Sequence, residues 1–373
     1  MTYIVATSSS FPSQYYSQEV LATALKKFCL AMDLDFELDI IDRFFTSVFV
    51  KGRYFTLPLD SFYDIPGPAA TARAAIEASI SLCEKNVLKL LEKTKLDPKE
   101  ISQLTCVTLT AAVPSIDARL MNRIPFSPSL KRCPIFGLGC LGGAAGVARV
   151  ADYLEGHPQE AAILLSVELA SALWQGSLQL DLQSMINGLP EDPSVYSDII
   201  STIVAAALFG DGSAGVLMVG RDHPLAQPGL PQVIDTRASW LPNTVHLMGM
   251  ELVDTGFRSI IRLQVGDYVK AGLRQAIDSL LEAHNLSVDK ISRWIVHPDG
   301  PKVLDAVEEE LGLDAQALKL SRETLAQAGN FLSATVLHML NETMTKEPPP
   351  RGTYDLLMAM GPGFSQELIL LQW

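Results

Sequence analysis

Cys140 stands in a glycine-rich segment that could hold a reactive thiol at a turn between a strand and a helix. It follows Gly139 and precedes the pair Gly142-Gly143, with a short apolar run at 134–136 before it and small residues at 144–151 after it. The backbone N–H groups and the dipole at a helix N-terminus favour a thiolate over a thiol. The glycines let a backbone or a substrate come close. The same residues also suit a buried cysteine beside a tightly packed helix, so the segment alone leaves both interpretations open.

A nucleophilic cysteine needs a base, and His297 is the histidine best placed to act as one. It follows the strand-like run 293–296 and precedes a Pro-Asp-Gly-Pro turn at 298–301. Ligand sites in α/β sheets commonly lie at such strand ends. The alternative is a hydrogen-bonded imidazole in the core.

Asn330 follows a glycine and opens an apolar segment that is typical of a helix. Its amide could cap that helix. It could equally donate a hydrogen bond to an oxygen on which negative charge develops during a reaction.

The elements that must position these residues alternate between strands and helices, which predicts an α/β architecture. We expect strands at 3–8, 101–110, 161–167, 216–219, 232–236, 293–296, 354–359 and 366–370, and helices at 16–32, 69–96, 118–124, 265–284, 301–311 and 329–342. Ser17 is the expected N-cap of the first helix. The segment 222–231, with three prolines, separates two similar halves at 1–221 and 232–373.

The composition limits the classes of protein to which the chain can belong. Its 373 residues are 48% hydrophobic and 19% charged, which is typical of a large globular protein. The net charge of −13 argues against nucleic acid as a general partner, because phosphate binding needs a basic field. No segment has the features of a signal peptide or the ~20 apolar residues of a membrane span. We therefore expect a cytoplasmic protein with no membrane span.

The cysteines and histidines show no spacing that is typical of a disulfide framework or a metal site. Five cysteines are an odd number, and C-x-x-C and H-E-x-x-H are both missing. We expect reduced thiols and no metal. One basic and aromatic segment, 42–54, could hold phosphates through Arg43, Lys51 and Arg53, although ordinary surface charges would look the same.

Several segments resemble motifs of the type III polyketide synthases, the chalcone synthase-like branch of the thiolase-fold condensing enzymes. The turn 139–143 resembles their nucleophile motif, 294–301 (Trp-Ile-Val-His-Pro-Asp-Gly-Pro) their histidine motif and 329–334 (Gly-Asn-Phe-Leu-Ser-Ala) their asparagine motif. The segments 207–214 and 360–364 match as well. Five motifs in order along the chain are specific, although a single glycine-cysteine turn is not. The chain looks more like the microbial members than the plant members.

The resemblance implies a duplicated five-layered αβαβα fold, a homodimer and a catalytic triad of Cys140, His297 and Asn330. It implies CoA thioesters as substrates, acyl-CoA and malonyl-CoA, with no metal or redox cofactor. The residues that it places at the pocket and its gate are Phe209, Phe257, Thr108, Gly361, Pro362 and Gly363. The residues that it places at the CoA phosphates are Arg43, Lys51, Arg53 and Lys302.

The implied reaction is iterative. Cys140 takes an acyl group from CoA, malonyl-CoA loses CO₂, and the resulting enolate extends the chain before it cyclises. A fatty-acyl starter and a pyrone or resorcinol product are expected from the likeness to microbial members. The chain departs from the family pattern in two places: it has extra residues centred on 180–198, and it has Asp299 where glycine is more usual.

Other interpretations stay open at this point. An initiating 3-ketoacyl synthase shares the fold and the triad but condenses once, with a malonyl group on acyl carrier protein. A non-catalytic or hydrolytic thiolase-fold protein is a further alternative, which the intact triad disfavours.

Overall fold

The computed structural model describes residues 1–33, 37–62, 68–109, 112–254, 256–262 and 264–373. Within these ranges the side chains at 61, 62, 68, 69, 173–180, 252, 256 and 257 are outside the description. One nine-stranded sheet runs through the molecule in the order β11-β12-β13-β8-β1-β7-β6-β4-β5. Its strands are β1 (Thr2–Ser10), β4 (Ile101–Val107), β5 (Lys131–Ile135), β6 (Ala161–Leu169), β7 (Asp211–Gly220), β8 (Gln232–Trp240), β11 (Ile291–Val296), β12 (Tyr354–Gly361) and β13 (Ser365–Gln372).

The two halves of this sheet repeat one strand order. In the first half β4 and β6 are parallel, and β6-β7 and β7-β1 are antiparallel. In the second half β11 and β12 are parallel, and β12-β13 and β13-β8 are antiparallel. A short pairing of β1 with β8 joins the halves. The duplication that the sequence only suggested is therefore visible in the topology.

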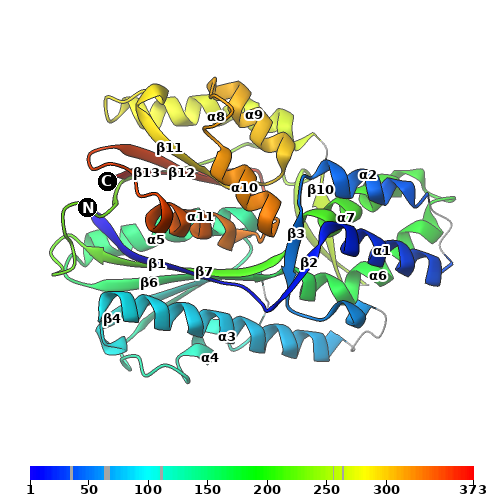
Figure 1. Ribbon diagram of the computed structural model, residues 1–373, viewed down its shortest axis with the longest axis horizontal. Coiled ribbons are helices and arrows are strands. Elements are labelled where there is room, and N and C mark those ends of the chain that lie inside the picture. The colour runs from blue at the N-terminus through cyan, green and yellow to red at the C-terminus, as the bar shows by residue number, and fades with distance from the viewer. Residues whose placement is uncertain (34–36, 63–67, 110–111, 255, 263) are drawn as a thin grey trace.

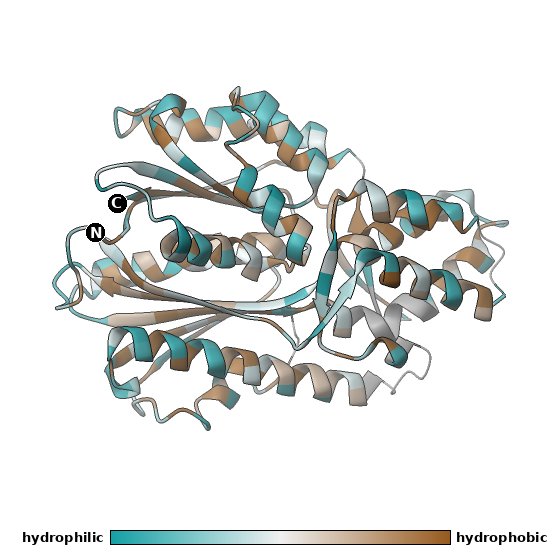
Figure 2. Cartoon of the chain, viewed as in Figure 1, coloured by the Kyte–Doolittle hydropathy of each residue, from teal (hydrophilic) through white to brown (hydrophobic). Residues whose placement is uncertain are grey.

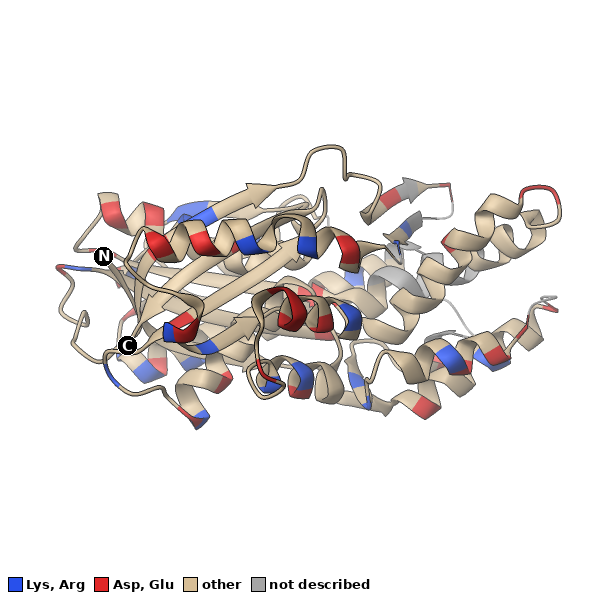
Figure 3. Cartoon of the chain, turned by 90° about the horizontal axis from the view of Figure 1, so that it is seen from above, with Lys and Arg blue, Asp and Glu red and all other residues tan. Residues whose placement is uncertain are grey.

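The helices complete five layers (Figure 1). Helix α3 (Pro68–Thr94) covers one outer face, and α8 (Val265–Glu282) with α9 (Pro301–Leu311) covers the other. Between the two half-sheets lie α5 (Gly142–Gly156) and α11 (Ser333–Lys346), which contact each other and strands of both halves. Strands such as β6 and β12 carry long apolar runs because both of their faces are covered, whereas the outer helices are amphipathic (Figure 2). Charged residues lie mainly on the outer helices, and the strands of the sheet contain few of them (Figure 3).

A helical lobe stands at one end of the layers, at the right in Figure 1. It contains α1 (Gln18–Ala31), α2 (Asp39–Ser47), α6 (Ala170–Gly188), α7 (Tyr196–Leu208) and two small two-stranded sheets, β2 (Gln14–Ser17) with β3 (Gly52–Phe55) and the hairpin of β9 (Met248–Val253) with β10 (Gly256–Ile261). The Ser17 hydroxyl caps α1 by accepting from the N–H of Val20, as predicted. The remaining α-helices are the short α4 (Ile116–Leu120) and α10 (Lys319–Ala328).

Two segments differ from the expected elements. The region 171–200, which has no clear sequence pattern, forms most of α6, a turn and the start of α7, so the extra residues at 180–198 belong to a helical hairpin. Asn330 does not open a helix, because α11 begins at Ser333. No helix in the described ranges is both long enough and apolar enough to cross a membrane.

Candidate active site

Cys140 lies in a 3₁₀ turn, Gly139–Leu141, that leads directly into α5. A Cβ at Gly143 would fall 2.1 Å from the carbonyl oxygen of Ser333, and one at Gly142 would fall 2.5 Å from Val107. These glycines therefore allow α5 to pack against α11 and β4. This is a correction to the idea that they leave room for a substrate.

His297 and Asn330 meet Cys140 from the second half of the chain. His297 directly follows β11 and is fully buried. Asn330 lies between α10 and α11 and pairs with Phe209 through backbone hydrogen bonds on both sides. Its side-chain nitrogen donates toward the Cys140 sulfur at 3.7 Å. Its side-chain oxygen accepts from the N–H of Leu332 at 2.7 Å, which fixes the orientation of the amide, and lies 3.9 Å from the same sulfur.

Asp299 adds a carboxyl group to this cluster. Its Oδ1 lies 3.4 Å from Nε2 of His297, and both side chains are almost completely buried. The Cys140 sulfur, a ring nitrogen of His297 and a carboxylate oxygen of Asp299 all lie within 4.8 Å of one another. Neither ring nitrogen of His297 has a hydrogen-bond partner among the described residues.

Burial sets the protonation states in this cluster, because charged forms lose their hydration. Burial raises the pKa of the Cys140 thiol well above its ordinary value, and a charge on Asp299 raises it further, while the hydrogen bond from Asn330 lowers it. Burial lowers the pKa of His297 to about 3 and raises that of Asp299 to about 8. In this arrangement the thiol and the imidazole are neutral. Burial therefore opposes the thiolate that the helix position led us to expect.

A small chamber of about 50 Å³ lies above the Cys140 sulfur. Its wall is mostly apolar and comes from both halves of the chain and from the β9–β10 hairpin. Members of the wall include Leu109, Phe209, Met248, Met250, Ile260 and Pro362. Phe209 and Pro362 thus lie where the sequence placed pocket residues.

The remaining pocket candidates have other positions. Thr108 is buried, and its neighbour Leu109 forms the wall. A Cβ at Gly361 would fall 2.7 Å from Leu141, so this glycine lets β12 approach the cysteine turn. Gly363 takes a positive φ of 74° in the turn that follows. Phe257 belongs to β10, but its side chain is outside the described part of the structure.

A larger cavity of about 570 Å³ lies next to the chamber. Met248, Ile261 and Asp299 belong to both walls, so the two spaces adjoin. The cavity wall also includes the basic residues Arg43, Arg262 and Lys302. Two of the four predicted CoA contacts, Arg43 and Lys302, are therefore at this opening.

The other two basic candidates lie elsewhere. Lys51 is exposed but does not line this cavity. Arg53 is 1% exposed and donates to the carbonyl oxygen of Phe209 at 2.7 Å, with its guanidinium over the rings of Phe45 and Phe55. A buried guanidinium cannot reach a phosphate at the surface. The expectation that Arg53 contacts CoA does not fit this position, and its observed contact supports the backbone of Phe209.

Glu168 is a buried acid at the site to which sequence reasoning gave no role. It lies at the end of β6, accepts from the hydroxyl of Ser333 and from the N–H of Leu109, and burial raises its pKa to about 8. It therefore ties the start of α11 to the chamber wall. An acidic residue at the end of a nearly continuous apolar run was the available signal.

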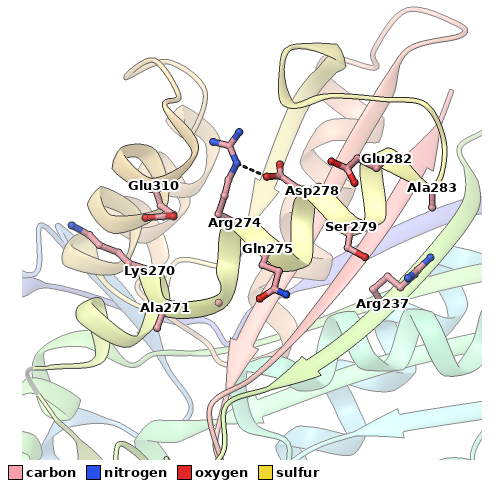
Figure 4. Close-up of a pocket in the computed structure, with 11 residues that line it drawn as sticks. Arg237, Lys270, Ala271, Arg274, Gln275, Asp278, Ser279, Glu282, Ala283 and Glu310 are labelled. Atoms are coloured by element: carbon pink, nitrogen blue, oxygen red, sulfur yellow. Dashed lines mark hydrogen bonds and ion pairs between the residues drawn. The ribbon is translucent and has the colours of Figure 1, made fainter.

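A further hollow lies away from this site. It measures about 940 Å³ and lies on the outer face of α8, where Arg274 pairs with Asp278 (Figure 4). Its lining carries charges of both signs and includes none of the chamber residues. It has no reactive group comparable to the Cys140 cluster.

The layers and the cysteine chamber define a condensing enzyme of the thiolase fold, and comparison with known proteins specifies the family. The family model "Chalcone and stilbene synthases, C-terminal domain" matches residues 232–373, and "FAE1/Type III polyketide synthase-like protein" matches residues 43–180. A 1,3,6,8-tetrahydroxynaphthalene synthase of Streptomyces peucetius is 38% identical over 100% of this chain and 93% of its own length. A putative chalcone synthase of Bacillus subtilis is 35% identical over 70% of this chain and 67% of its own length.

Solved structures agree in fold. The crystal structure of 1,3,6,8-tetrahydroxynaphthalene synthase from Streptomyces coelicolor superposes with a TM-score of 0.86 at 24% identity, covering 100% of this chain and 99% of that one. PKS-I of the brown alga Ectocarpus siliculosus superposes with a TM-score of 0.85 at 20% identity, covering 100% of this chain and 98% of that one. The chain belongs to the type III polyketide synthases, which are decarboxylating condensing acyltransferases. Enzymes of this family use CoA thioesters and need no further cofactor.

Proposed function

We propose that this enzyme loads an acyl group from CoA on Cys140, extends it by repeated condensation with malonyl-CoA, and closes the chain to an aromatic product. The observation that carries the proposal is the convergence of Cys140, His297 and Asn330 below a chamber that adjoins a cavity with basic residues. The cavity suits the phosphates of CoA, and the chamber suits the reacting acyl group.

In the loading step His297 acts as the base. The neutral imidazole takes the proton of the Cys140 thiol as the sulfur attacks the thioester carbonyl. The Cys140–carbon bond forms and the carbon–sulfur bond to CoA breaks. Because the free thiol has a raised pKa, deprotonation occurs together with attack rather than before it.

In the extension step malonyl-CoA loses CO₂ and leaves an enolate. The enolate oxygen needs hydrogen-bond donors, and the Asn330 amide is held in place for this by Leu332. His297 can serve as a second donor through a ring nitrogen. The enolate carbon then attacks the Cys140 thioester and expels the sulfur as a thiolate, which starts the next cycle.

For the product, the likeness to tetrahydroxynaphthalene synthases favours a naphthalene. The ring carbons and alternating hydroxyl groups of that product correspond to two-carbon units throughout, so malonyl-CoA would supply both starter and extender. A fatty-acyl starter with a pyrone or resorcinol product is the second candidate. The apolar wall with flexible Met248 and Met250 favours it, because methionines can move to admit an alkyl chain.

One experiment tests these proposals together. The purified protein is incubated with malonyl-CoA alone and with a series of acyl-CoA starters, and product masses are measured. A naphthalene from malonyl-CoA alone supports the first candidate, and alkylated pyrones or resorcinols support the second. Single condensations that require acyl carrier protein would contradict both and favour an initiating ketoacyl synthase.

We also propose a homodimer in the cytoplasm. β5 is an edge strand of the sheet, and the segments that follow β4 and β5 expose Val113 (98%) and Phe136 (60%). Large apolar side chains beside an unpaired strand edge favour association. Sedimentation equilibrium of the wild type and of Phe136→Asp tests this: the wild type should have twice the chain mass, and the variant should dissociate more readily.

A further inference from the structure

Asp299 has features that a passive turn residue does not need. It lies between β11 and α9, and its backbone N–H donates to the carbonyl oxygen of His297 at 3.1 Å. Its side chain is 3% exposed, with Oδ1 3.4 Å from Nε2 of His297. Its second oxygen, Oδ2, has no hydrogen-bond partner in the described part of the chain. A buried carboxyl with an unpaired oxygen is costly unless it serves a purpose.

Asp299 lies where the bond between the acyl carbon and the CoA sulfur would break during acyl transfer. Its side chain borders both the Cys140 chamber and the larger cavity that holds Arg43 and Lys302. When CoA occupies the cavity and its acyl carbon meets Cys140, the CoA sulfur must lie at the junction of the two spaces. Asp299 is the acidic residue in the wall at that junction.

Each transfer of an acyl group to Cys140 releases CoA as a thiolate, which needs a proton. In the first loading step the Cys140 thiol can supply that proton. In later cycles it cannot, because condensation expels Cys140 as a thiolate. A proton donor at the CoA sulfur would remove this imbalance.

We propose that the Asp299 carboxyl group is the general acid that protonates the departing CoA sulfur, an inference that rests on the proposed function. The Cys140–carbon bond forms, the carbon–sulfur bond to CoA breaks, and the proton moves from Asp299 to that sulfur. In the first loading step Asp299 regains a proton from His297, which has taken it from the thiol. In later cycles it regains one from water in the outer cavity.

The charges around Asp299 agree with this role. Burial raises its pKa to about 8, so the carboxyl holds its proton at neutral pH and matches the ~8.5 of an ordinary thiol. Cys140 and His297 face it from the chamber side, and Arg43, Arg262 and Lys302 line the cavity on the other side. His297 is the poorer resting acid, because burial lowers its pKa to about 3.

The test compares leaving groups that do and do not need a proton. The same acyl group is presented as a CoA ester and as a thiophenyl ester, whose more acidic thiol leaves as a thiolate. Single-turnover acylation of Cys140 is followed by mass spectrometry in the wild type, Asp299→Asn, Asp299→Gly and the exposed control Asp305→Asn.

We expect both Asp299 variants to lose about 10²-fold or more with the CoA ester, the usual scale of general acid catalysis. They should lose less than about fivefold with the thiophenyl ester. The wild-type rate with the CoA ester should fall as pH rises through about 8, and this fall should be missing in Asp299→Asn. Asp305→Asn should match the wild type.

Equal losses with both esters would show a structural effect and overturn the inference, as would no loss with either. These outcomes can be distinguished from a failure of the proposed function itself. If the proposed function is wrong, the wild type carries no acyl group on Cys140 with any CoA ester.

Discussion

The side-chain nitrogen of Asn330 lies 3.7 Å from the Cys140 sulfur, although 190 positions separate the two residues. The contact depends on the amide orientation, which the N–H of Leu332 fixes. It also depends on the backbone pairing of Asn330 with Phe209, which brings the second half of the chain to the chamber. The donor is therefore in place before any substrate arrives, as electrostatic stabilisation of an enolate requires.

Replacing Asn330 by alanine should slow malonyl-CoA decarboxylation by ~10²–10³-fold, because one donor to the developing oxyanion is lost. Acylation of Cys140 by an acyl-CoA should fall much less, since the cysteine and His297 remain. CO₂ release and intact-protein mass measure the two steps. Asn122→Ala, at an exposed position, is the control. Equal losses in both steps would contradict the assignment.

The protonation of Cys140 gives a second prediction. Its thiol has a raised pKa, so at pH 7 the thiolate fraction is small and grows as pH increases. Alkylation of Cys140 by iodoacetamide in the free enzyme should therefore rise continuously from pH 7 to above pH 9. Asn330→Ala should shift the profile to higher pH, because the hydrogen bond from Asn330 lowers the thiol pKa.

Peptide mapping after alkylation measures this rate. Cys133, the one cysteine that is not classed as buried, is the internal reference. A rate for Cys140 that is already constant below pH 7 would show a stable thiolate and contradict the prediction.

Much of the layered fold could be predicted from sequence because its elements carry local signals. The apolar run of β6 and the helix pattern of α3 agree with the structure to within a few residues. The α/β class and the thiolase-like layers follow from such signals and from the motifs. The β9–β10 hairpin and the α6–α7 pair carry weaker signals, because their buried apolar residues face a cavity and other helices of the same lobe rather than one sheet.

The candidate site was predictable where residue type determines chemistry and not where burial does. Cys140, His297 and Asn330 stand out by motif, and the structure brings them together. The sequence suggests that Arg53 is a cation at the surface, because arginine is rarely buried. Its burial depends on distant glycines: a Cβ at Gly329 would fall 2.8 Å from its side chain. No local pattern reports such a contact.

The contrast between Arg43 and Arg53 gives a third prediction. Arg43→Ala should raise the KM for malonyl-CoA about tenfold with little change in kcat, because a charged hydrogen bond contributes ~1.5–3 kcal/mol. Arg53→Ala should instead lower the free energy of unfolding by ~3 kcal/mol, since it leaves a cavity and removes the hydrogen bond from Arg53 to the Phe209 carbonyl oxygen. Steady-state kinetics and urea unfolding separate the effects. A larger KM effect in Arg53→Ala than in Arg43→Ala would restore the phosphate role to Arg53.

The helical hairpin at 180–198 is fixed to the chamber wall by two arginines of the β10 region. Arg258 binds Asp181 with two nitrogens, at 2.6 and 2.9 Å, and Asp181 is 2% exposed. Arg262, which also lines the outer cavity, pairs with Asp198 at 2.8 Å and is more exposed. The extra residues are therefore tied by ion pairs to the wall of the outer cavity.

Asp181→Ala should lower the free energy of unfolding by ~2 kcal/mol, because it leaves the guanidinium of Arg258 partly buried without its main partner. Asp198→Ala should cost less, about 1 kcal/mol, because Asp198 is 25% exposed and its pair with Arg262 is partly screened by solvent. Urea unfolding measures both, with the exposed Glu191→Ala as control. Limited proteolysis should cleave Asp181→Ala faster at the turn 189–193. If this variant unfolds and is cleaved like the wild type, the ion pair does not hold the hairpin against β10.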